Sequence, residues 1–212
     1  MEKSNIKSID TNYLNSIGFK GNQINQIYDL INRSIKEQLY TKIHFPYHNL
    51  EHIERVLCYC TWILNMKVSK GEFLKNNDIL FYSALYHDCG RNFFVTNKMH
   101  GIVGAKLAKE KLKNDFSDRD LNAIELLIET HANSNDIVNF KDYKFSEKEK
   151  ENIQILSNIL KDADALDRNR IKLFKFARCN PNYLRTNEAK EIYYDSTIFL
   201  ENYEKAKNVI NL

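Results

Sequence analysis

Asp78-Ile-Leu-Phe-Tyr-Ser-Ala-Leu-Tyr-His-Asp-Cys-Gly-Arg91 is an apolar run that ends in an adjacent histidine and aspartate, His87 and Asp88. In a helix, His87 lies on the same face as Leu80 and Ala84, the face that enters a core. A buried imidazole and a buried carboxylate both need partners, because desolvating them unpaired costs roughly several kcal/mol. The simplest interpretation of one such pair is a histidine whose hydrogen-bonding groups are satisfied by a nearby carboxylate. The positions of the other histidines therefore decide what this stretch does.

The composition of the chain favours helices. Among 212 residues there are two prolines and six glycines, and 43% of the residues are hydrophobic. Long stretches follow the helical period, so we expect a nearly all-α protein. The length suits one domain over 1–212, with 1–40 as an N-terminal helical extension packed on it.

Charge and hydropathy exclude several classes of protein. The net charge is +3 and the lysines are spread among acids, so we expect no nucleic-acid binding. No run of 18 apolar residues occurs and the N-terminus does not resemble a signal peptide, which predicts a cytoplasmic protein without a membrane partner. The four cysteines form no CxxC pair and are expected to be reduced.

Hydrophobic periodicity and capping residues divide the chain into helices. Ser117 with Asp120, and Ser146 with Glu149, indicate two helix starts of the capping-box type. The expected helices cover about 24–39 and 77–89, and others run onward from about 47, 100, 117, 146 and 188.

Histidines recur on the core-facing sides of four of these helices. An isolated histidine on an apolar face is usually a satisfied core residue, but five together with a set of aspartates are hard to explain independently. Neutral imidazole and carboxylate groups are ligands for Zn, Mn, Fe, Co or Ni. More than four such ligands suggests an open or two-ion site, and hence hydrolysis. The residues are His48, His52, His87, His100 and His131, with Asp88, Asp162, Asp164 and Asp167.

The order His52, His87-Asp88, Asp164 resembles the H…HD…D signature of the HD-domain superfamily of metal-dependent phosphohydrolases, over roughly 44–170. The resemblance implies a helical bundle with these four residues around a metal ion at its centre. It also implies hydrolysis of a phosphomonoester, phosphoanhydride or phosphodiester bond of a nucleotide-type substrate by a metal-bound water. One or two divalent transition-metal ions would be the cofactor, their identity left open.

Two shorter motifs resemble different branches of that superfamily. Tyr-His-Asn-Leu-Glu-His over 47–52 is similar to the start of cyclic-nucleotide phosphodiesterases and of small bacterial HD proteins, which implies a general acid at His48. The segments around His100 and His131 look like the two-metal branch that hydrolyses symmetrical dinucleoside polyphosphates. There these histidines would hold a second ion, bridged to the first by Asp88. Because the two motifs resemble different branches of the superfamily, the sequence does not identify the substrate.

Further residues are candidates for the reaction and for phosphate binding. In the superfamily, the last metal ligand along the chain is usually an aspartate that follows an alanine, which selects Asp164 over Asp162. Arg91 stands where many relatives have a lysine or arginine. We expect it to contact phosphate and so to act with His48 and Asp88 in catalysis. The alternative is that Arg91 forms a surface salt bridge. Lys106 and Arg168 are weaker phosphate candidates. The segment 178–185 either lines the pocket mouth or caps a helix.

Several functions remain in competition at this point. The first is a phosphohydrolase acting on a small nucleotide or phosphoester, and the second a phosphodiesterase for a cyclic or signalling nucleotide. A non-catalytic metal- or nucleotide-binding sensor belongs to another class, and a di-iron oxygenase is a fourth reading. The oligomeric state is left open, a homodimer included.

Overall fold

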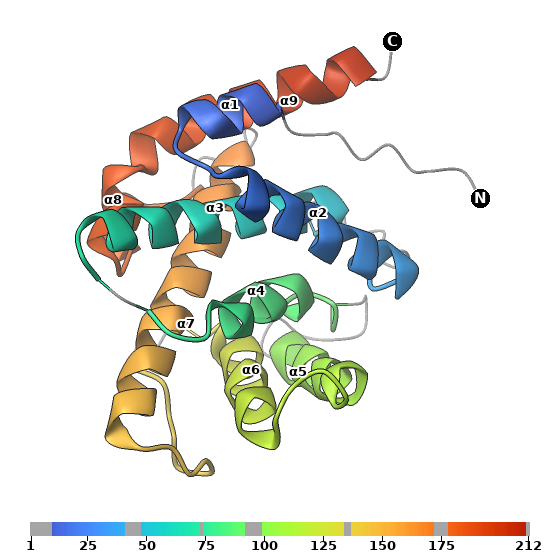
Figure 1. Ribbon diagram of the computed structural model, residues 1–212, viewed down its shortest axis with the longest axis vertical. Helices are drawn as coiled ribbons and strands as arrows, with labels where there is room; N and C mark the ends of the chain where they lie inside the picture. The colour runs from blue at the N-terminus through green and yellow to red at the C-terminus, as the bar shows by residue number, and fades with distance from the viewer. Residues whose placement is uncertain are drawn as a thin grey trace.

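The computed structural model describes residues 10–40, 48–72, 74–91, 99–133, 137–171 and 178–210, without the side chains of 207–210. The described part of the chain contains helices and no strand, which confirms the all-α prediction (Figure 1). The α-helices are α1 Thr11–Ser16, α2 Gly21–Lys36, α3 Leu50–Ser69, α4 Asn77–Tyr86, α5 Met99–Leu112, α6 Asp118–Thr130, α7 Glu147–Asp167, α8 Asn187–Glu191 and α9 Tyr193–Ile210, with short 3₁₀ turns η1 Arg168–Arg170 and η3 Pro181–Tyr183.

Helix α3 is the centre of the bundle. It is buried on nearly every side and packs against α7, α4 and α2. Figure 1 shows α7 crossing behind α3, with α9 at one end of the molecule and the α5–α6 pair at the other. A helix that is buried on most of its faces is stable in such a position, because each of those faces meets another helix. Among the described residues, no helix is both long enough and apolar enough to cross a membrane.

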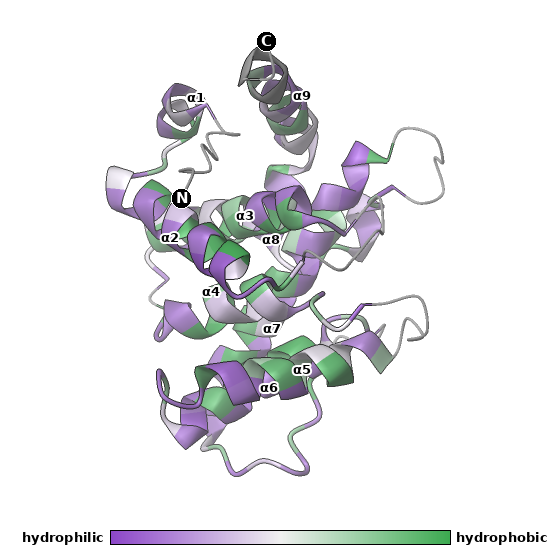
Figure 2. Ribbon diagram, turned by 90° about the vertical axis from the view of Figure 1, so that its right-hand side faces the viewer, coloured by the Kyte–Doolittle hydropathy of each residue, from purple (hydrophilic) through white to green (hydrophobic). Residues whose placement is uncertain are grey.

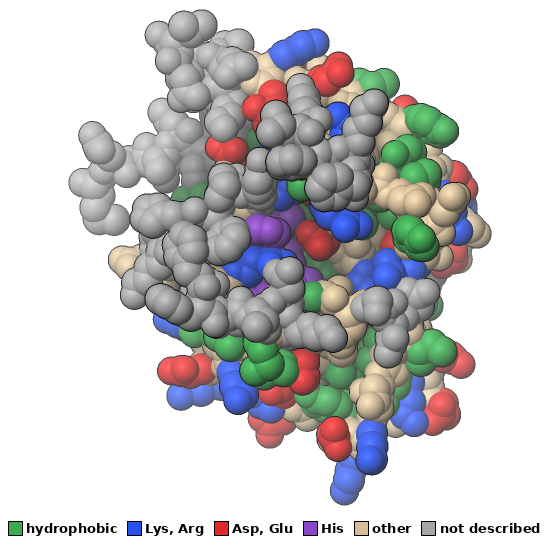
Figure 3. Space-filling model, turned by 180° about the vertical axis from the view of Figure 1, so that it is seen from behind, with side chains coloured by type: hydrophobic (Ala, Val, Ile, Leu, Met, Phe, Trp, Pro, Cys, Tyr) green, Lys and Arg blue, Asp and Glu red, His purple; other side chains and the backbone are tan. Residues whose placement is uncertain are grey.

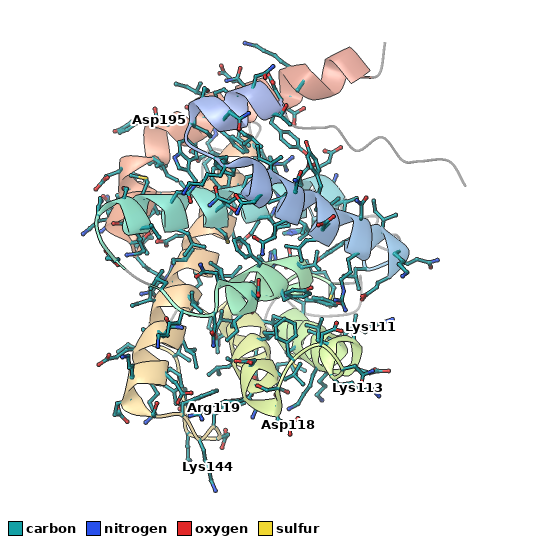
Figure 4. All side chains as sticks on the ribbon, viewed as in Figure 1. Lys111, Lys113, Asp118, Arg119, Lys144 and Asp195 are labelled. Carbon is teal, nitrogen blue, oxygen red and sulfur yellow. The ribbon has the colours of Figure 1, made fainter. Side chains whose placement is uncertain are left out.

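Helices α5 and α6 form a hairpin that brings distant histidines together. The short connection between them makes the helices antiparallel neighbours, side by side in Figures 1 and 2. Ser117 caps α6 as predicted by accepting the backbone N–H of Asp120 at 3.2 Å. His100 in the first turn of α5 and His131 just after α6 therefore lie at the same end of the pair. Figure 4 labels charged residues at the opposite, loop end, where Lys111, Lys113 and Asp118 point outward.

Glycines allow α5 to approach both the end of α4 and its partner helix α6 closely. A Cβ atom on Gly90 would lie 2.2 Å from the carbonyl oxygen of His100, and one on Gly101 would lie 2.8 Å from the carbonyl oxygen of Glu129. Neither atom could be accommodated without moving backbone. The small residues therefore permit close helix contact, and the contact places His100 beside His87 and Asp88.

Two predicted helices have different limits in the structure. The central helix ends at Tyr86, so His87 and Asp88 lie in the turn that follows it. The N–H of Cys89 bonds three residues back to Tyr86 at 3.1 Å, which tightens the chain into a turn. The last predicted helix is two helices, α8 and α9, separated at Ile192.

The N-terminal helices pack on this bundle through hydrogen bonds and ion pairs as well as through apolar contacts. Arg33 of α2 bonds to Glu37 at 2.6 Å, and the hydroxyl of Tyr86 bonds to the same carboxylate. The hydroxyl of Tyr40 donates to the backbone oxygen of Leu85 at 2.6 Å. These bonds connect residues 33–40 to the end of α4 that carries the histidine and aspartate.

Candidate metal centre

Five helix ends meet around the His87-Asp88 turn. His52 comes from the first turn of α3 and His100 from the first turn of α5, whereas His131 follows the end of α6 and Asp164 stands in the last turn of α7. These residues are far apart along the chain and are assembled by the packing of α3 on α7 and of α5 on α6. Apart from Asp164 and His48, the predicted cluster residues are buried.

Asp88 lies between two groups of histidines. Its Oδ2 atom is 3.4 Å from Nε2 of His52 and 3.6 Å from Nε2 of His87. Its Oδ1 atom is 3.2 Å from Nε2 of His100 and 3.5 Å from Nε2 of His131. One carboxylate thus faces two sets of imidazole nitrogens, as a bridging ligand must.

Three imidazole rings are held so that Nε2 faces Asp88. The Nδ1 atom of His87 bonds to the backbone oxygen of Ala84 at 2.8 Å, and that of His131 to the backbone oxygen of Ile128 at 2.6 Å. A carbonyl can only accept, so Nδ1 carries the hydrogen in both rings. In His52, Nδ1 bonds to a carboxylate oxygen of Asp167 at 2.6 Å. Metal-binding histidines are oriented by such partners, which leave the Nε2 lone pair for the ion.

The spacing of these nitrogens fits a metal ion. Nε2 of His52 lies 3.3 Å from Nε2 of His87, and Nε2 of His100 lies 2.9 Å from Nε2 of His131. Two imidazole nitrogens bound at about 2.1 Å to one ion are about 3.0–3.4 Å apart. Sets of three ligand atoms within 4.8 Å of one another occur in His52, His87 and Asp164, in His87, Asp88 and His131, and in His48, His52 and Asp88. The residues present therefore suit one or two divalent ions.

The three aspartates near the end of α7 have different positions. Asp164 faces the histidines, with Oδ1 at 3.4 Å from Nε2 of His52. Asp167 lies one turn further and is fully buried against His52. Asp162 points elsewhere: its carboxylate accepts the backbone N–H groups of Arg185 and Thr186. Of the two aspartates weighed in the sequence, the structure brings Asp164 to the histidines.

Asp167 is surrounded by cations as well as by His52. Arg55, one turn along α3 from His52, donates to it at 2.6 Å, and Arg170 donates to it from η1. Burial raises the pKa of Asp167, but Arg55 and His52 outweigh this effect and hold its pKa below the usual range. Arg55 was not among the residues predicted from the sequence. Its position three residues after a candidate ligand, one turn along the same expected helix, was the available signal.

The protonation of the histidines follows from these contacts. Burial lowers the pKa of His87 to about 3, so its Nε2 atom has a lone pair at neutral pH. Burial also lowers the pKa of His52, but hydrogen bonds with Asp167 and Asp88 outweigh it and raise the value to about 9. Without an ion, the carboxylates of Asp167 and Asp88 therefore stabilise the protonated form of His52. Burial likewise lowers the pKa of His100.

His48 contacts the cluster from a less buried position. It precedes α3, and its Nδ1 atom is 2.5 Å from Oδ2 of Asp88. Its side chain is 22% exposed, whereas that of His52 is fully buried. Partial exposure suits a group that meets substrate, although the contact distances also allow His48 to be a ligand.

The predicted phosphate-binding cations lie in three different places. Arg91 is partly buried and donates to Oδ1 of Asp88 at 2.6 Å, so its ion pair is with the cluster itself. Arg168 is exposed and lines a pocket that also contains Asp164 and His131. Lys106 is exposed on α5, two residues after Gly104, which packs against α4. Residues two apart point to nearly opposite sides of a helix, so Lys106 points away from α4.

A hollow exposes the cluster on one face of the molecule. Figure 3, viewed from behind Figure 1, shows histidine side chains at its base with lysine and arginine side chains around it. The pocket that opens beside Asp164 has a volume of about 520 Å³. A positively charged hollow with imidazoles and carboxylates at its base suits a phosphorylated small molecule.

A comparison with protein-family models finds one match, HD domain, over residues 49–169. The matched segment begins at the cap of α3, ends in η1 and includes every residue of the cluster except His48. No curated protein and no solved structure matches the chain.

Proposed function

Because the chain belongs to the HD domain family, a superfamily of metal-dependent phosphohydrolases, we propose that it hydrolyses a phosphoester or phosphoanhydride bond of a nucleotide-type substrate. The observation that supports this most strongly is Asp88, whose two oxygens face separate pairs of imidazole Nε2 atoms. The proposed ligands of a first ion are His52, His87, Asp88 and Asp164, and those of a second are Asp88, His100 and His131.

The ions would supply Lewis-acid chemistry, lowering the pKa of water and neutralising the oxygens of a phosphoryl group. The protein side chains hold these ions and place the substrate. Asp164 is 29% exposed and lines the pocket, so it is the most exposed of the proposed ligands. Arg91 and Arg168 are the guanidinium groups proposed to bind phosphate oxygens, for which their planar donors are suited.

We assign proton transfer to His48. The Asp88 carboxylate accepts from Nδ1 of His48 at 2.5 Å, which orients the ring and makes Nε2 the atom that exchanges a proton with the leaving oxygen. This contact also favours the alternative substrate class, a cyclic or signalling nucleotide, because an alkoxide leaving group needs a proton donor. Among the residues that the structure describes, no feature favours the sensor or the oxygenase reading over hydrolysis.

Phosphoester turnover tests the proposal. Protein treated with chelator and then supplied with Mn²⁺ should hydrolyse p-nitrophenyl phosphate or bis-p-nitrophenyl phosphate, and His87→Ala protein prepared in the same way should not. Metal binding without turnover of any phosphoester would instead indicate a sensor. A requirement for oxygen would indicate the oxygenase reading.

A further inference from the structure

Arg91 bonds to the same carboxylate oxygen that the second pair of histidines faces. Its Nε atom donates to Oδ1 of Asp88 at 2.6 Å, a short hydrogen bond between two charged groups. The Nε2 atoms of His100 and His131 lie 3.2 and 3.5 Å from that oxygen. The guanidinium of Arg91 and the proposed second ion therefore share one ligand oxygen.

The charge of Arg91 reaches a proposed ligand of the second ion. Burial lowers the pKa of His100, a hydrogen bond with Asp88 partly opposes this, and the charge of Arg91 lowers the pKa further. A positive charge that disfavours a proton on this ring also disfavours a divalent cation beside it, because the ion carries twice the charge of the proton. The side chain of Arg91 is only 18% exposed, so solvent screens the repulsion only in part.

The backbone before Arg91 is held against the helix that carries His100. The N–H of Arg91 bonds to the backbone oxygen of Asp88 at 3.0 Å. The preceding residue, Gly90, is pressed against α5, since a Cβ atom on it would lie 2.2 Å from the carbonyl oxygen of His100. A change in the contact between Arg91 and Asp88 therefore comes from rotation of the arginine side chain.

We propose that Arg91 competes with the second metal ion for Oδ1 of Asp88, so that binding of this ion moves the guanidinium to the substrate phosphate. The inference rests on the proposed function for the second ion and for the phosphate contact. A carboxylate oxygen and a phosphate oxygen both suit the guanidinium, so one residue has two successive partners. Arg91 thereby determines how tightly the chain holds its second ion.

Two other roles for Arg91 predict different effects on metal binding. An arginine that only orients Asp88 as a ligand would strengthen the binding of metal, so its removal would weaken it. An arginine that only binds phosphate would leave the affinity for metal unchanged. Competition predicts the opposite of the first role: removal of Arg91 strengthens the binding of the second ion.

Titration of chelator-treated protein with Mn²⁺ measures the affinities of the two ions, with the free ion followed by electron paramagnetic resonance. Arg91→Met removes the charge and keeps much of the length of the side chain. This variant should bind the second ion roughly 5- to 150-fold more tightly, the usual size of the coupling between two binding events, while the affinity for the first ion changes much less. Arg91→Lys keeps a cation and should stay close to the unaltered protein.

Arg168→Met is the matched control. Arg168 lines the pocket together with His131, and no contact between Arg168 and Asp88 occurs among the described residues. The control removes the same charge nearby and should change the affinity for the second ion less than Arg91→Met does. Equal strengthening of both ions in Arg91→Met, a second ion that binds no more tightly to it, or an equal effect in Arg168→Met overturns the competition.

Binding of inorganic phosphate tests the second position of the guanidinium. With both ions at saturation, Arg91→Met should bind phosphate more weakly than the unaltered protein in calorimetry, because the displaced guanidinium is then missing. Equal phosphate affinity overturns the transfer of the guanidinium to phosphate.

Turnover of p-nitrophenyl phosphate with Mn²⁺ is measured on the same samples. If Arg91→Met binds the second ion more tightly but the unaltered protein hydrolyses no phosphoester, the competition stands and the proposed hydrolase function fails. If the unaltered protein hydrolyses the ester but the affinity for the second ion is the same in Arg91→Met, the hydrolase function stands and the competition fails.

Discussion

The two sides of Asp88 are built differently. On the Oδ2 side, His52 is held by the buried carboxylate of Asp167, and a further carboxylate, Asp164, faces the same nitrogens. On the Oδ1 side, His131 is held by a neutral backbone carbonyl. The buried Nδ1 atom of His100 has no hydrogen-bond partner among the described residues.

This difference predicts unequal affinities for metal. A carboxylate that accepts from the far nitrogen of a ligand histidine orients the ring and increases its basicity, more than a neutral carbonyl does. A second carboxylate ligand adds negative charge on the Oδ2 side. We therefore expect a first ion that is tightly bound and a second that exchanges more readily. The following predictions test this contrast, in order of their effect on bound metal.

Asp88→Ala should remove both ions and all phosphoester turnover, since Asp88 is the residue shared by the two sides. Metal analysis of protein prepared without chelator measures the loss, with circular dichroism to confirm the fold. Asp162→Asn is the control, because it alters an equally buried carboxylate that bonds to Arg185 and Thr186. Full metal occupancy in Asp88→Ala protein would show that the cluster is a structural network.

His131→Ala should remove one ion of the two. The Oδ2 side keeps His52, His87 and Asp164, so occupancy should fall from two ions per chain toward one. Titration with a weak chelator should remove the same ion first from the unaltered protein. Loss of both ions, or retention of both, would contradict the division of the site at Asp88.

Asp167→Asn should weaken binding of the first ion by roughly 10- to 100-fold and leave the second unchanged. Asparagine keeps the shape of the side chain but removes the negative charge that faces His52, Arg55 and Arg170. Competition with a chelator measures the affinity. Thermal unfolding of the metal-free protein separately measures the stability lost with the ion pairs of Arg55 and Arg170. Weaker binding of the second ion, with unchanged binding of the first, would contradict the predicted difference between the two sides of Asp88.

His48→Ala should have the smallest effect on metal. Both ions should remain, and kcat should fall by roughly 10²–10⁴, the usual contribution of a positioned general acid. The loss should be greater for an alkyl ester than for p-nitrophenyl phosphate, whose leaving group needs little protonation. Steady-state kinetics on the two esters checks this. A variant that loses an ion would identify His48 as a ligand, as its 2.5 Å contact with Asp88 permits.

Local pattern was sufficient for most of the helices and for the family. The capping residues Ser117 and Ser146 start helices at the positions expected, because a cap is a contact between residues three apart. The spacing of apolar residues also predicted that His131 would face a core, since a helix converts sequence spacing into a shared face. The ordered His52, His87-Asp88 and Asp164 identified the family now shown for the chain.

Tertiary structure decided what happens beyond the helix ends. Sequence spacing could not show that Asp167 holds His52 or that Arg55 supports it, since these residues are 115 and 112 positions from Asp167. Nor could it choose whether the segment 180–185 lines the pocket, which depends on its anchor at Asp162. Helical periodicity specifies direction only within one helix. The relation between two helices is determined by packing, and the metal cluster and its pocket lie where different helices meet.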